Sequence, residues 1–365
     1  MTKLKVVLGL SGGVDSSVAG YLLKKQGHDV IGVFMKNWEE KDENGRCTSD
    51  VDYEDARKVA NKLDIPFYSV NYAKEYWDRV FQYFLSEYKR GRTPNPDVLC
   101  NREIKFGPFL DYANKIGADC IATGHYCKIV EVDGLKYLAK PRDLNKDQTY
   151  FLNQLSYSQI DKVLFPLDEI EKPQVREIAE ELGLSTAAKK DSTGICFIGE
   201  RNFRNFLKEY LPAQKGLMKT LDGKVIGEHL GLMYYTIGQR KGLDIGGIKG
   251  FDDGRWFVVK KDLINNVLYV QNGDDRELMS NSCVSENFNF ITKQPDQKSF
   301  ECFVKCRYRQ PDVKAFVTID GQKVTAEFAK PERAVTEGQY LVMYTTEGLC
   351  LGGGAIDVVS KLKNH

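Results

Sequence analysis

Apolar runs and amphipathic stretches alternate through the first third of the chain. Four short apolar runs predict buried strands at residues 6–10, 30–35, 66–70 and 120–123. Between them, apolar residues recur at helical spacing over residues 16–26, 52–63, 74–90 and 104–116. This alternation predicts an α/β fold with a doubly wound parallel sheet, because parallel neighbours need a crossover helix. Ligands in that architecture bind beyond the carboxyl ends of the strands.

The pattern changes twice after this α/β part. Residues 227–254 hold eight glycines and show little helical period, which indicates a small glycine-rich region. After about residue 283, residues 300–307, 313–319, 323–328 and 340–344 alternate between apolar and polar, which predicts a small β-barrel. We therefore expect a catalytic domain over 1–210, a small central domain over 211–282 and a β-rich domain over 283–365.

Composition narrows the class of protein. The 365 residues are 42% hydrophobic and 28% charged, with a net charge of +1 and a mean hydropathy of −0.41. These values are typical of a folded protein and exclude a disordered chain or one that spans a membrane. Nucleic-acid binding would need a local basic groove, since the overall charge is nearly zero.

The number and spacing of the cysteines indicate the cellular compartment in which the protein works. There are nine cysteines, no Cys-x-x-Cys pair, and no signal peptide at the start of the chain. We expect a cytoplasmic protein in which most cysteines are thiols and any disulfide belongs to the catalytic cycle. Cys302 and Cys306 have a poor zinc spacing, without a second pair.

The segment from Ser11 to Ser17, Ser-Gly-Gly-Val-Asp-Ser-Ser, links the first predicted strand to the first predicted helix. Its glycines permit a close backbone approach, and its N–H groups and hydroxyls suit a phosphate. Asp15 beside a phosphate implies a bound Mg²⁺. The loop lacks the lysine of a GxxxxGK[ST] motif, which argues against ordinary γ-phosphoryl transfer. A simple glycine turn is the alternative, although it needs neither the serines nor the acid.

In this setting the SGGxDSS pattern resembles the pyrophosphatase loop of N-type ATP pyrophosphatases. Members of that superfamily split ATP between the α- and β-phosphates and adenylate an oxygen of the substrate. They include synthetases for GMP, NAD, asparagine and argininosuccinate, as well as tRNA thiolases. The loop alone does not choose among these activities.

Two segments each contain a cysteine that is a candidate for a reactive thiol. Residues 91–101 contain Pro94, Pro96 and Cys100, and the two prolines predict a rigid connection that is neither helix nor central strand. Lys89, Arg90, Arg92 and Arg102 lie nearby, and positive charge lowers a thiol pKa. Residues 189–198 contain Gly194, which predicts a turn, with Lys189 and Lys190 upstream of Cys196. Either cysteine alone could be a buried small apolar residue.

Several segments occur together and in order: 95–101, 122–126, 146–150, 192–197, 235–240 and 304–308. With the loop, this set resembles the bacterial tRNA-specific 2-thiouridylases, which make 2-thiouridine at the wobble position. The resemblance extends over nearly the whole chain. It implies ATP-dependent adenylation of the uracil C2 oxygen and sulfur transfer from a cysteine persulfide, with ATP and Mg²⁺ required.

The resemblance also implies roles for particular residues. Cys196 is expected to carry the persulfide, Cys100 to be its partner thiol, and Asp97 to act as general base or to orient the uridine. Asp15 is the expected Mg²⁺ ligand. The expected ATP-binding residues are Gly9, Leu10, Ser11, Gly12, Gly13, Val14, Asp15, Ser16, Met35 and Gly124. The expected tRNA contacts are Asn95, Pro96, Asp97, His125, Lys146, Asp147, Gln148, Arg307, Tyr308 and Gln339, with Lys305 part of a local basic cluster.

The implied partners are tRNAs for Lys, Glu and Gln, and a cysteine desulfurase or sulfur-relay protein as donor; no membrane is expected. Two other hypotheses remain open at this point. A pyrophosphatase-loop ligase such as argininosuccinate synthetase would explain the loop but not the two cysteine segments. A tRNA-binding module that uses ATP only as a regulatory ligand would show no tRNA-dependent AMP production.

Overall fold

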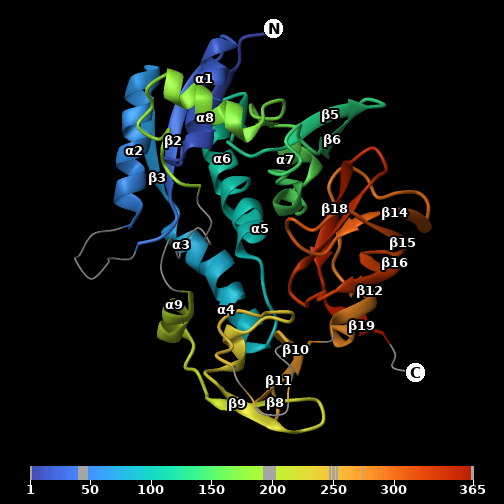
Figure 1. Ribbon diagram of the computed structural model, residues 1–365. Coiled ribbons are helices and arrows are strands. Elements are labelled where there is room, and N and C mark those ends of the chain that lie inside the picture. The colour runs from blue at the N-terminus through green and yellow to red at the C-terminus, as the bar shows by residue number, and fades with distance from the viewer. Residues whose placement is uncertain are drawn as a thin grey trace.

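The computed structural model describes residues 2–39, 48–191, 203–245, 248, 251, 254–273 and 275–362. Figure 1 shows an α/β part formed by the N-terminal residues, a small sheet built from residues near 216–272, and a strand-rich part at the C-terminus. Among the described residues, no helix is both long and apolar enough to cross a membrane.

The first sheet has five strands in the order β3-β2-β1-β4-β7, and each neighbouring pair is parallel. The strands are β1 Lys5–Gly9, β2 Asp29–Lys36, β3 Phe67–Asn71, β4 Cys120–Ala122 and β7 Val163–Leu164. The first four match the predicted strands to within one residue at each end. The doubly wound parallel sheet is confirmed, and its order reverses between β1 and β4, where such folds bind ligands.

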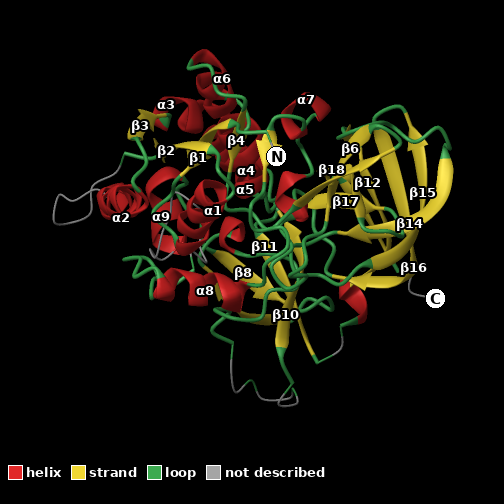
Figure 2. Cartoon of the chain, turned by 90° about the horizontal axis from the view of Figure 1, so that it is seen from above, coloured by secondary structure: helices red, strands yellow, loops and turns green. Residues whose placement is uncertain are grey.

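Two apolar cores cover the two faces of this sheet. Within β1, Val6 and Leu8 belong to one core and Val7 to the other, so the strand is buried on both sides. Figure 2 shows helices on each side of the strands. One face carries α1 Val14–Lys25, α2 Thr48–Leu63 and α8 Lys172–Glu181. The other carries α3 Ala73–Tyr76, α4 Gln82–Lys89, α5 Pro96–Cys100 and α6 Pro108–Lys115, with π-helical turns at Trp77–Phe81 and Asn101–Lys105.

A four-stranded sheet follows, in the order β10-β11-β8-β9. Its strands are β8 Gly216–Lys219, β9 Val225–His229, β10 Trp256–Asp262 and β11 Val267–Asn272, and α9 Phe203–Tyr210 precedes them. Val258 and Leu268 from this sheet belong to the same apolar cluster as Phe84 of α4. The small sheet is therefore packed directly on the α/β part.

The third sheet runs β19-β12-β16-β15-β14-β17-β18-β6-β5, with β13 paired to β18, and it curves around its own core (Figure 2). Its C-terminal strands are β12 Met279–Ser285, β13 Asn289–Phe290, β14 Ser299–Lys305, β15 Val313–Asp320, β16 Lys323–Arg333, β17 Tyr340–Tyr344, β18 Leu349–Ala355 and β19 Val358–Lys361.

The hairpin of β5 Lys128–Val132 and β6 Leu135–Ala139 comes from the α/β part of the sequence but extends this third sheet. Leu349 pairs with Ala139 and Cys350 with Leu138. The short α7 Tyr157–Ile160 packs beside β6. The sequence prediction assigned residues 128–139 to the catalytic domain alone; the structure shows them continuous with the C-terminal sheet.

Candidate active site

The loop between β1 and α1 folds around the first turn of α1. The Ser16 hydroxyl accepts a hydrogen bond from the Ser11 backbone N–H at 3.2 Å and donates one to the Gly13 carbonyl at 3.1 Å. Gly12 has φ +76°, and a Cβ there would lie 2.2 Å from the Asp52 carbonyl oxygen, so only glycine fits. Backbone N–H groups at such a helix start suit phosphate oxygens.

Two further parts of the predicted nucleotide site meet this loop from neighbouring strands. Gly124 follows β4, and a Cβ on it would lie 2.7 Å from the Ser16 backbone nitrogen. Gly9 ends β1, and a Cβ on it would lie 3.1 Å from Met35 Cε. The structure thus brings Gly9, Met35 and Gly124 together with residues 10–16 at the carboxyl edge of the sheet. Their binding of ATP stays a prediction.

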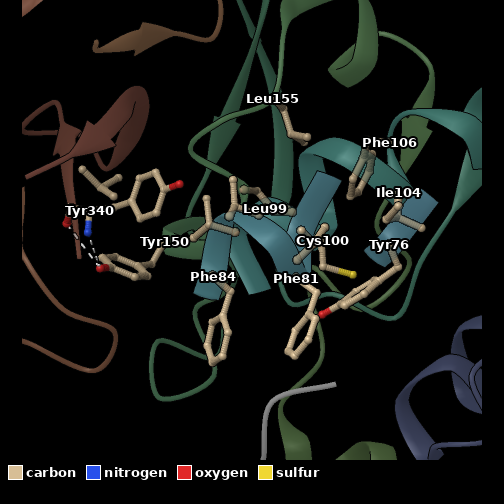
Figure 3. Close-up of a cluster of buried hydrophobic side chains, with 14 of the residues drawn as sticks. Tyr76, Phe81, Phe84, Leu99, Cys100, Ile104, Phe106, Tyr150, Leu155 and Tyr340 are labelled. Atoms are coloured by element: carbon tan, nitrogen blue, oxygen red, sulfur yellow. Dashed lines mark hydrogen bonds between the residues drawn. The ribbon is translucent and has the colours of Figure 1, made fainter. Parts of the chain in front are cut away.

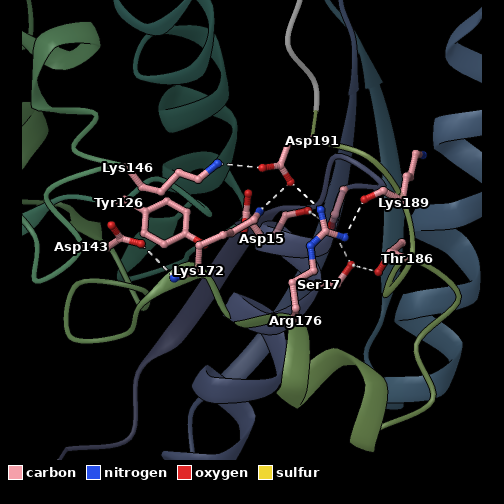
Figure 4. Close-up of polar contacts among 12 residues, drawn as sticks. Asp15, Ser17, Tyr126, Asp143, Lys146, Lys172, Arg176, Thr186, Lys189 and Asp191 are labelled. Atoms are coloured by element: carbon pink, nitrogen blue, oxygen red, sulfur yellow. Dashed lines mark hydrogen bonds and ion pairs between the residues drawn. The ribbon is translucent and has the colours of Figure 1, made fainter. Parts of the chain in front are cut away.

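Ion pairs connect Asp15 in this loop, through Lys172, to Asp191 (Figure 4). Lys172 Nζ lies 2.6 Å from Asp15 Oδ1 and 2.8 Å from Asp191 Oδ1. The Tyr126 hydroxyl donates to the same Asp15 oxygen at 2.7 Å. Burial and the Asp15 charge together raise the pKa of Tyr126, which keeps it a donor. Four distant segments therefore meet at Asp15 and Asp191.

Asp191 collects two more cations. Lys146 Nζ lies 2.7 Å from Asp191 Oδ2, and Arg176 Nη2 lies 2.6 Å from Asp191 Oδ1. Burial alone would raise the pKa of Asp191, but hydrogen bonds from Lys146 and Lys172 hold it well below its ordinary value. Asp191 is therefore a firmly ionised anchor for three cationic side chains.

Lys189 makes a second link to the phosphate loop. Its Nζ donates to the Gly12 carbonyl at 2.9 Å and lies 2.7 Å from both Asp52 Oδ1 and Asp55 Oδ2 on α2. Burial alone would lower the pKa of Lys189, but hydrogen bonds to the two carboxylates raise it. The loop is thus fixed by a charged side chain as well as by its own hydrogen bonds.

Lys172 occupies an unfavourable place for a cation. It follows the N-cap Glu171 of α8 and is 9% exposed, so its charge is buried near the positive end of a helix dipole. The opposing carboxylates of Asp15 and Asp191 offset this cost. Arg176 lies one turn later, four residues along α8, so the helix presents two cations toward Asp191.

The donor set can be tested against a metal ion. No group of three or more His, Cys, Asp or Glu side chains within the described ranges could hold a metal on its own. Mg²⁺ commonly takes one or two carboxylates and fills its other positions with phosphate oxygens and water. Asp15, in the loop, fits a Mg²⁺ site of this kind, in which one carboxylate and the phosphates of the substrate hold the ion.

Cys100 lies on the opposite face of the sheet. It is the last residue of α5, is 1% exposed, and packs among Tyr76, Phe81 and Ile104 (Figure 3). The expectation that the prolines exclude a helix here is wrong. Pro96 occupies the first turn, where its missing N–H costs nothing, and the Asn95 side chain caps the helix by accepting from the Asp97 and Val98 N–H groups.

Three of the four cations expected around Cys100 pair with acids. Arg90 and Arg92 pair with Glu87, and Arg102 pairs with Glu103. The sequence argument counted only the cations near Cys100 along the chain. In the fold their charges are directed to carboxylates, and an apolar cluster surrounds the cysteine.

Two predicted tRNA contacts join parts of the fold: Asp147 links the α/β part to the C-terminal sheet, and Arg307 links the C-terminal part to Ile237 of the small central part. Asp147 is 4% exposed; its Oδ2 lies 3.0 Å from Lys305 Nζ, and its Oδ1 accepts from Thr149. Arg307 donates to the Ile237 carbonyl and, at 2.6 Å, to the Thr336 hydroxyl. These contacts give both residues a structural task.

The remaining predicted contacts lie at varied depths. Tyr308 packs against Phe151 with ring centroids 4.3 Å apart. Gln339 donates from Nε2 to the Thr93 carbonyl at 2.8 Å, and Gln148 exchanges hydrogen bonds with the backbone of Tyr126. His125 Nδ1 is 2.8 Å from Thr123 Oγ1, and burial with the Lys105 charge lowers its pKa, so the ring is neutral.

Cys196, the predicted persulfide carrier, lies outside the described residues, so its distance from Cys100 stays a prediction. Sequence reasoning missed Lys172, Arg176 and the anchoring role of Asp191. Asp191 had a visible signal, since it directly precedes the Ser-Thr-Gly sequence of the segment that bears Cys196. Lys172 and Arg176 had only their helical i, i+4 spacing.

Three models of known protein families match successive parts of the chain. Residues 4–200 match the family model described as a tRNA methyl transferase HUP domain, and residues 204–272 match the PRC-barrel domain of the same series. Residues 280–356 match an aminomethyltransferase β-barrel domain. These descriptions agree with the α/β, small-sheet and curved-sheet parts of the fold.

Curated relatives match over the full length. The tRNA-specific 2-thiouridylase MnmA of Streptococcus thermophilus strain CNRZ 1066 is 59% identical over 362 residues, covering 99% of this chain and 97% of the relative. The MnmA of Streptococcus sanguinis strain SK36 is 58% identical over 358 residues, covering 98% and 96%. A solved U34-tRNA thiolase, NcsA of Methanococcus maripaludis, is 20% identical with a TM-score of 0.34, covering 54% of this chain and 62% of that one.

Proposed function

The chain belongs to the tRNA-specific 2-thiouridylase family of sulfurtransferases, and on that premise we propose that it thiolates C2 of the wobble uridine in an ATP-dependent reaction. The observation that carries the proposal is the Lys172 bridge. One ammonium group binds Asp15 in the phosphate loop and Asp191 at the start of the segment that bears Cys196. ATP chemistry and sulfur chemistry would therefore meet at one edge of the sheet.

Adenylation is the first proposed step. The uracil C2 oxygen is a poor leaving group, so the reaction attaches it to the α-phosphorus of ATP and expels pyrophosphate. The loop 10–16 would hold the phosphates through its N–H groups, and Lys172, Arg176 and Lys146 would offset charge on the departing pyrophosphate. Mg²⁺ held at Asp15 would neutralise phosphate charge.

Sulfur transfer is the second step. A persulfide on Cys196 supplies a nucleophilic sulfur that bonds to C2, and AMP leaves with the former C2 oxygen. The Cys100 thiolate forms a disulfide with Cys196, either by releasing hydrosulfide first or after direct attack by the persulfide. Both routes end in a Cys100–Cys196 disulfide that an external thiol must reduce. Asp97 would act as base or orient the uracil.

Burial constrains this chemistry. Because Cys100 is 1% exposed, we expect its surroundings to rearrange before its sulfur reaches a persulfide. Active-site loops commonly open and close in this way during a cycle. We expect tRNA binding beside α5 to supply the energy for opening.

For tRNA recognition, we propose direct contacts by six half-buried candidates. These are Asn95, Asp97, His125, Lys146, Gln148 and Tyr308. Pro96, Asp147, Arg307 and Gln339 would act by shaping the surface. The proposed partners are tRNAs for Lys, Glu and Gln and a cysteine desulfurase or relay protein, and the proposed site of action is the cytoplasm.

The test separates the two steps. Cys196→Ser should abolish 2-thiouridine but leave tRNA-dependent AMP formation, because it removes the sulfur carrier and not the phosphate site. Cys100→Ser should also block turnover and accumulate one extra sulfur on Cys196. The readouts are nucleoside analysis of the tRNA, AMP release, and mass spectrometry after incubation with a desulfurase and cysteine. Cys120→Ser is the control, because Cys120 is 8% exposed in β4 and burial raises its pKa to about 11.

Two results would contradict the proposal. A Cys196→Ser enzyme that still thiolates would remove the persulfide from that residue. Absence of tRNA-dependent AMP from the unaltered protein would reject adenylation altogether and would favour a tRNA-binding module.

A further inference from the structure

The segment just before Asn95 is held by the small central part and by the C-terminal sheet. Thr93 donates its backbone N–H to the Glu337 carbonyl at 3.0 Å, and its carbonyl accepts from Gln339 Nε2 at 2.8 Å. Its hydroxyl lies 3.4 Å from that of Thr236, in the small-sheet part of the chain. Both backbone polar groups of this one residue are therefore satisfied by residues 337–339.

The flanking residues are held in the same way. Arg92 Nη1 lies 3.0 Å from Asp357 Oδ1, and its Nη2 donates to the Asp357 carbonyl. The Gly91 carbonyl accepts from Lys261 Nζ at 3.0 Å, and a Cβ on Gly91 would lie 2.9 Å from Leu263. Contacts from the small sheet and the C-terminal sheet thus converge on residues 91–93.

The approach is too close to be incidental. Gly338 has φ +87°, and a Cβ there would lie 3.0 Å from both the nitrogen and the carbonyl carbon of Thr93. Glycine is needed for the backbone conformation and for the space. The Gln339 backbone is fixed in turn by hydrogen bonds with Ile356 and Thr336.

The chain after residue 93 is stiff. Pro94 is buried, Asn95 caps α5, and Pro96 begins it, so a displacement at Thr93 is passed to Asp97 and Cys100 with little loss. We propose that Gln339 and Arg92 are positioning residues, which use the C-terminal sheet to fix α5 relative to bound tRNA. This inference rests on the proposed thiolation and gives Gln339 a task other than touching RNA.

The clamp is tested first without substrates. Gln339→Ala and Gly338→Ala should each speed hydrogen exchange of the Thr93 amide several-fold, measured by mass spectrometry on peptides spanning 91–101. Gln339→Glu should behave as Gln339→Ala, because a carboxylate cannot donate to the Thr93 carbonyl. Gln322→Ala, on the exposed turn between β15 and β16, is the control and should leave exchange unchanged. This readout needs neither ATP nor tRNA, so it stands or fails apart from the proposed function.

Turnover is tested second. Both Gln339 variants should lower kcat about tenfold while changing the Kd for tRNA by less than about threefold, with an unchanged salt dependence of binding. Arg92→Lys should retain more activity than Arg92→Ala, because it keeps the charge beside Asp357. Unchanged exchange in Gln339→Ala and Gly338→Ala would overturn the clamp. A loss of tRNA affinity with unchanged exchange would overturn it in favour of direct RNA contact.

Discussion

The phosphate loop and the α5 segment both belong to the α/β part, but different interactions hold them in place. Around the loop, charged groups hold one another: Lys172 and Lys189 are each bound by two carboxylates. Around Cys100 the neighbours are apolar, and precision comes from backbone contacts to the other sheets at Thr93. The first arrangement is suited to binding and releasing a polyanion. The second keeps the Cys100 side chain buried.

The difference separates what each region should lose when it is altered. Changes in the loop should remove ATP chemistry and leave the fold and tRNA affinity largely intact. Changes in the contacts between the α/β part and the C-terminal sheet should first lower stability. The largest effect is expected in the loop, at the carboxylate of Asp15.

Asp15→Ala should lower tRNA-dependent AMP formation about 10³-fold, because it removes the carboxylate that would hold Mg²⁺ and that positions Lys172. The Kd for tRNA should stay within a few-fold, since the carboxylate contacts Tyr126 and Lys172 and the expected metal binds phosphates and not RNA. Asp29→Ala is a matched control, because Asp29 is exposed at the start of β2, at the opposite end of the sheet. AMP release and filter binding measure the two effects. A wild-type AMP yield from Asp15→Ala would remove Asp15 from the metal site.

Lys305→Ala should reduce the free energy of unfolding by about 3–5 kcal/mol, because it leaves the buried carboxylate of Asp147 without its ion pair. The matched control is Lys314→Ala, whose partner Glu301 is exposed, and about 1 kcal/mol or less is expected. Urea denaturation compares the two. The sequence places Lys305 in a basic cluster expected to contact tRNA, and that contact stays a prediction. A shallower salt dependence of tRNA binding with unchanged stability would favour that contact.

The part of the site that is contiguous in sequence was predictable. Residues 11–17 carry their own glycines and serines, and their place between a strand and a helix follows from local patterning. Lys172 and Asp191 join Asp15 from 157 and 176 positions away, and no local pattern sets such pairings. The helix that begins at Pro96 could not be predicted, because the sequence does not distinguish a proline in the first turn of a helix from one that prevents a helix. The hydrogen bonds of the Asn95 cap, which decide between the two, are visible only in the fold. The pairing of Ala139 with Leu349 is likewise long-range.

Tyr150→Phe should cost about 1–3 kcal/mol of unfolding free energy. The buried Tyr150 hydroxyl accepts from the Tyr340 N–H at 3.1 Å and lies 3.3 Å from the Tyr340 carbonyl (Figure 3), so its removal leaves buried backbone groups unsatisfied. Tyr68→Phe is the control, because the Tyr68 side chain in β3 is exposed. It should change the free energy of unfolding by less than about 0.5 kcal/mol. Equal effects from the two substitutions would show that this hydrogen bond does not join the α/β part to the C-terminal sheet.

The smallest effect per measured step concerns pH and Lys261, whose Nζ joins the small sheet to the Gly91 carbonyl. Burial lowers the pKa of Lys261 to about 8. Between pH 8 and about 10.5 the unfolded chain therefore binds one more proton at this residue than the folded chain does, so stability should rise with pH in that window. The contribution is at most about 1.4 kcal/mol per pH unit. Lys261→Met should remove this rise, whereas Lys260→Met, on the exposed side of β10, should retain it. Urea midpoints at pH 7, 8, 9 and 10 measure the slope, and identical slopes in Lys261→Met and the unaltered protein would show that this lysine is charged when folded.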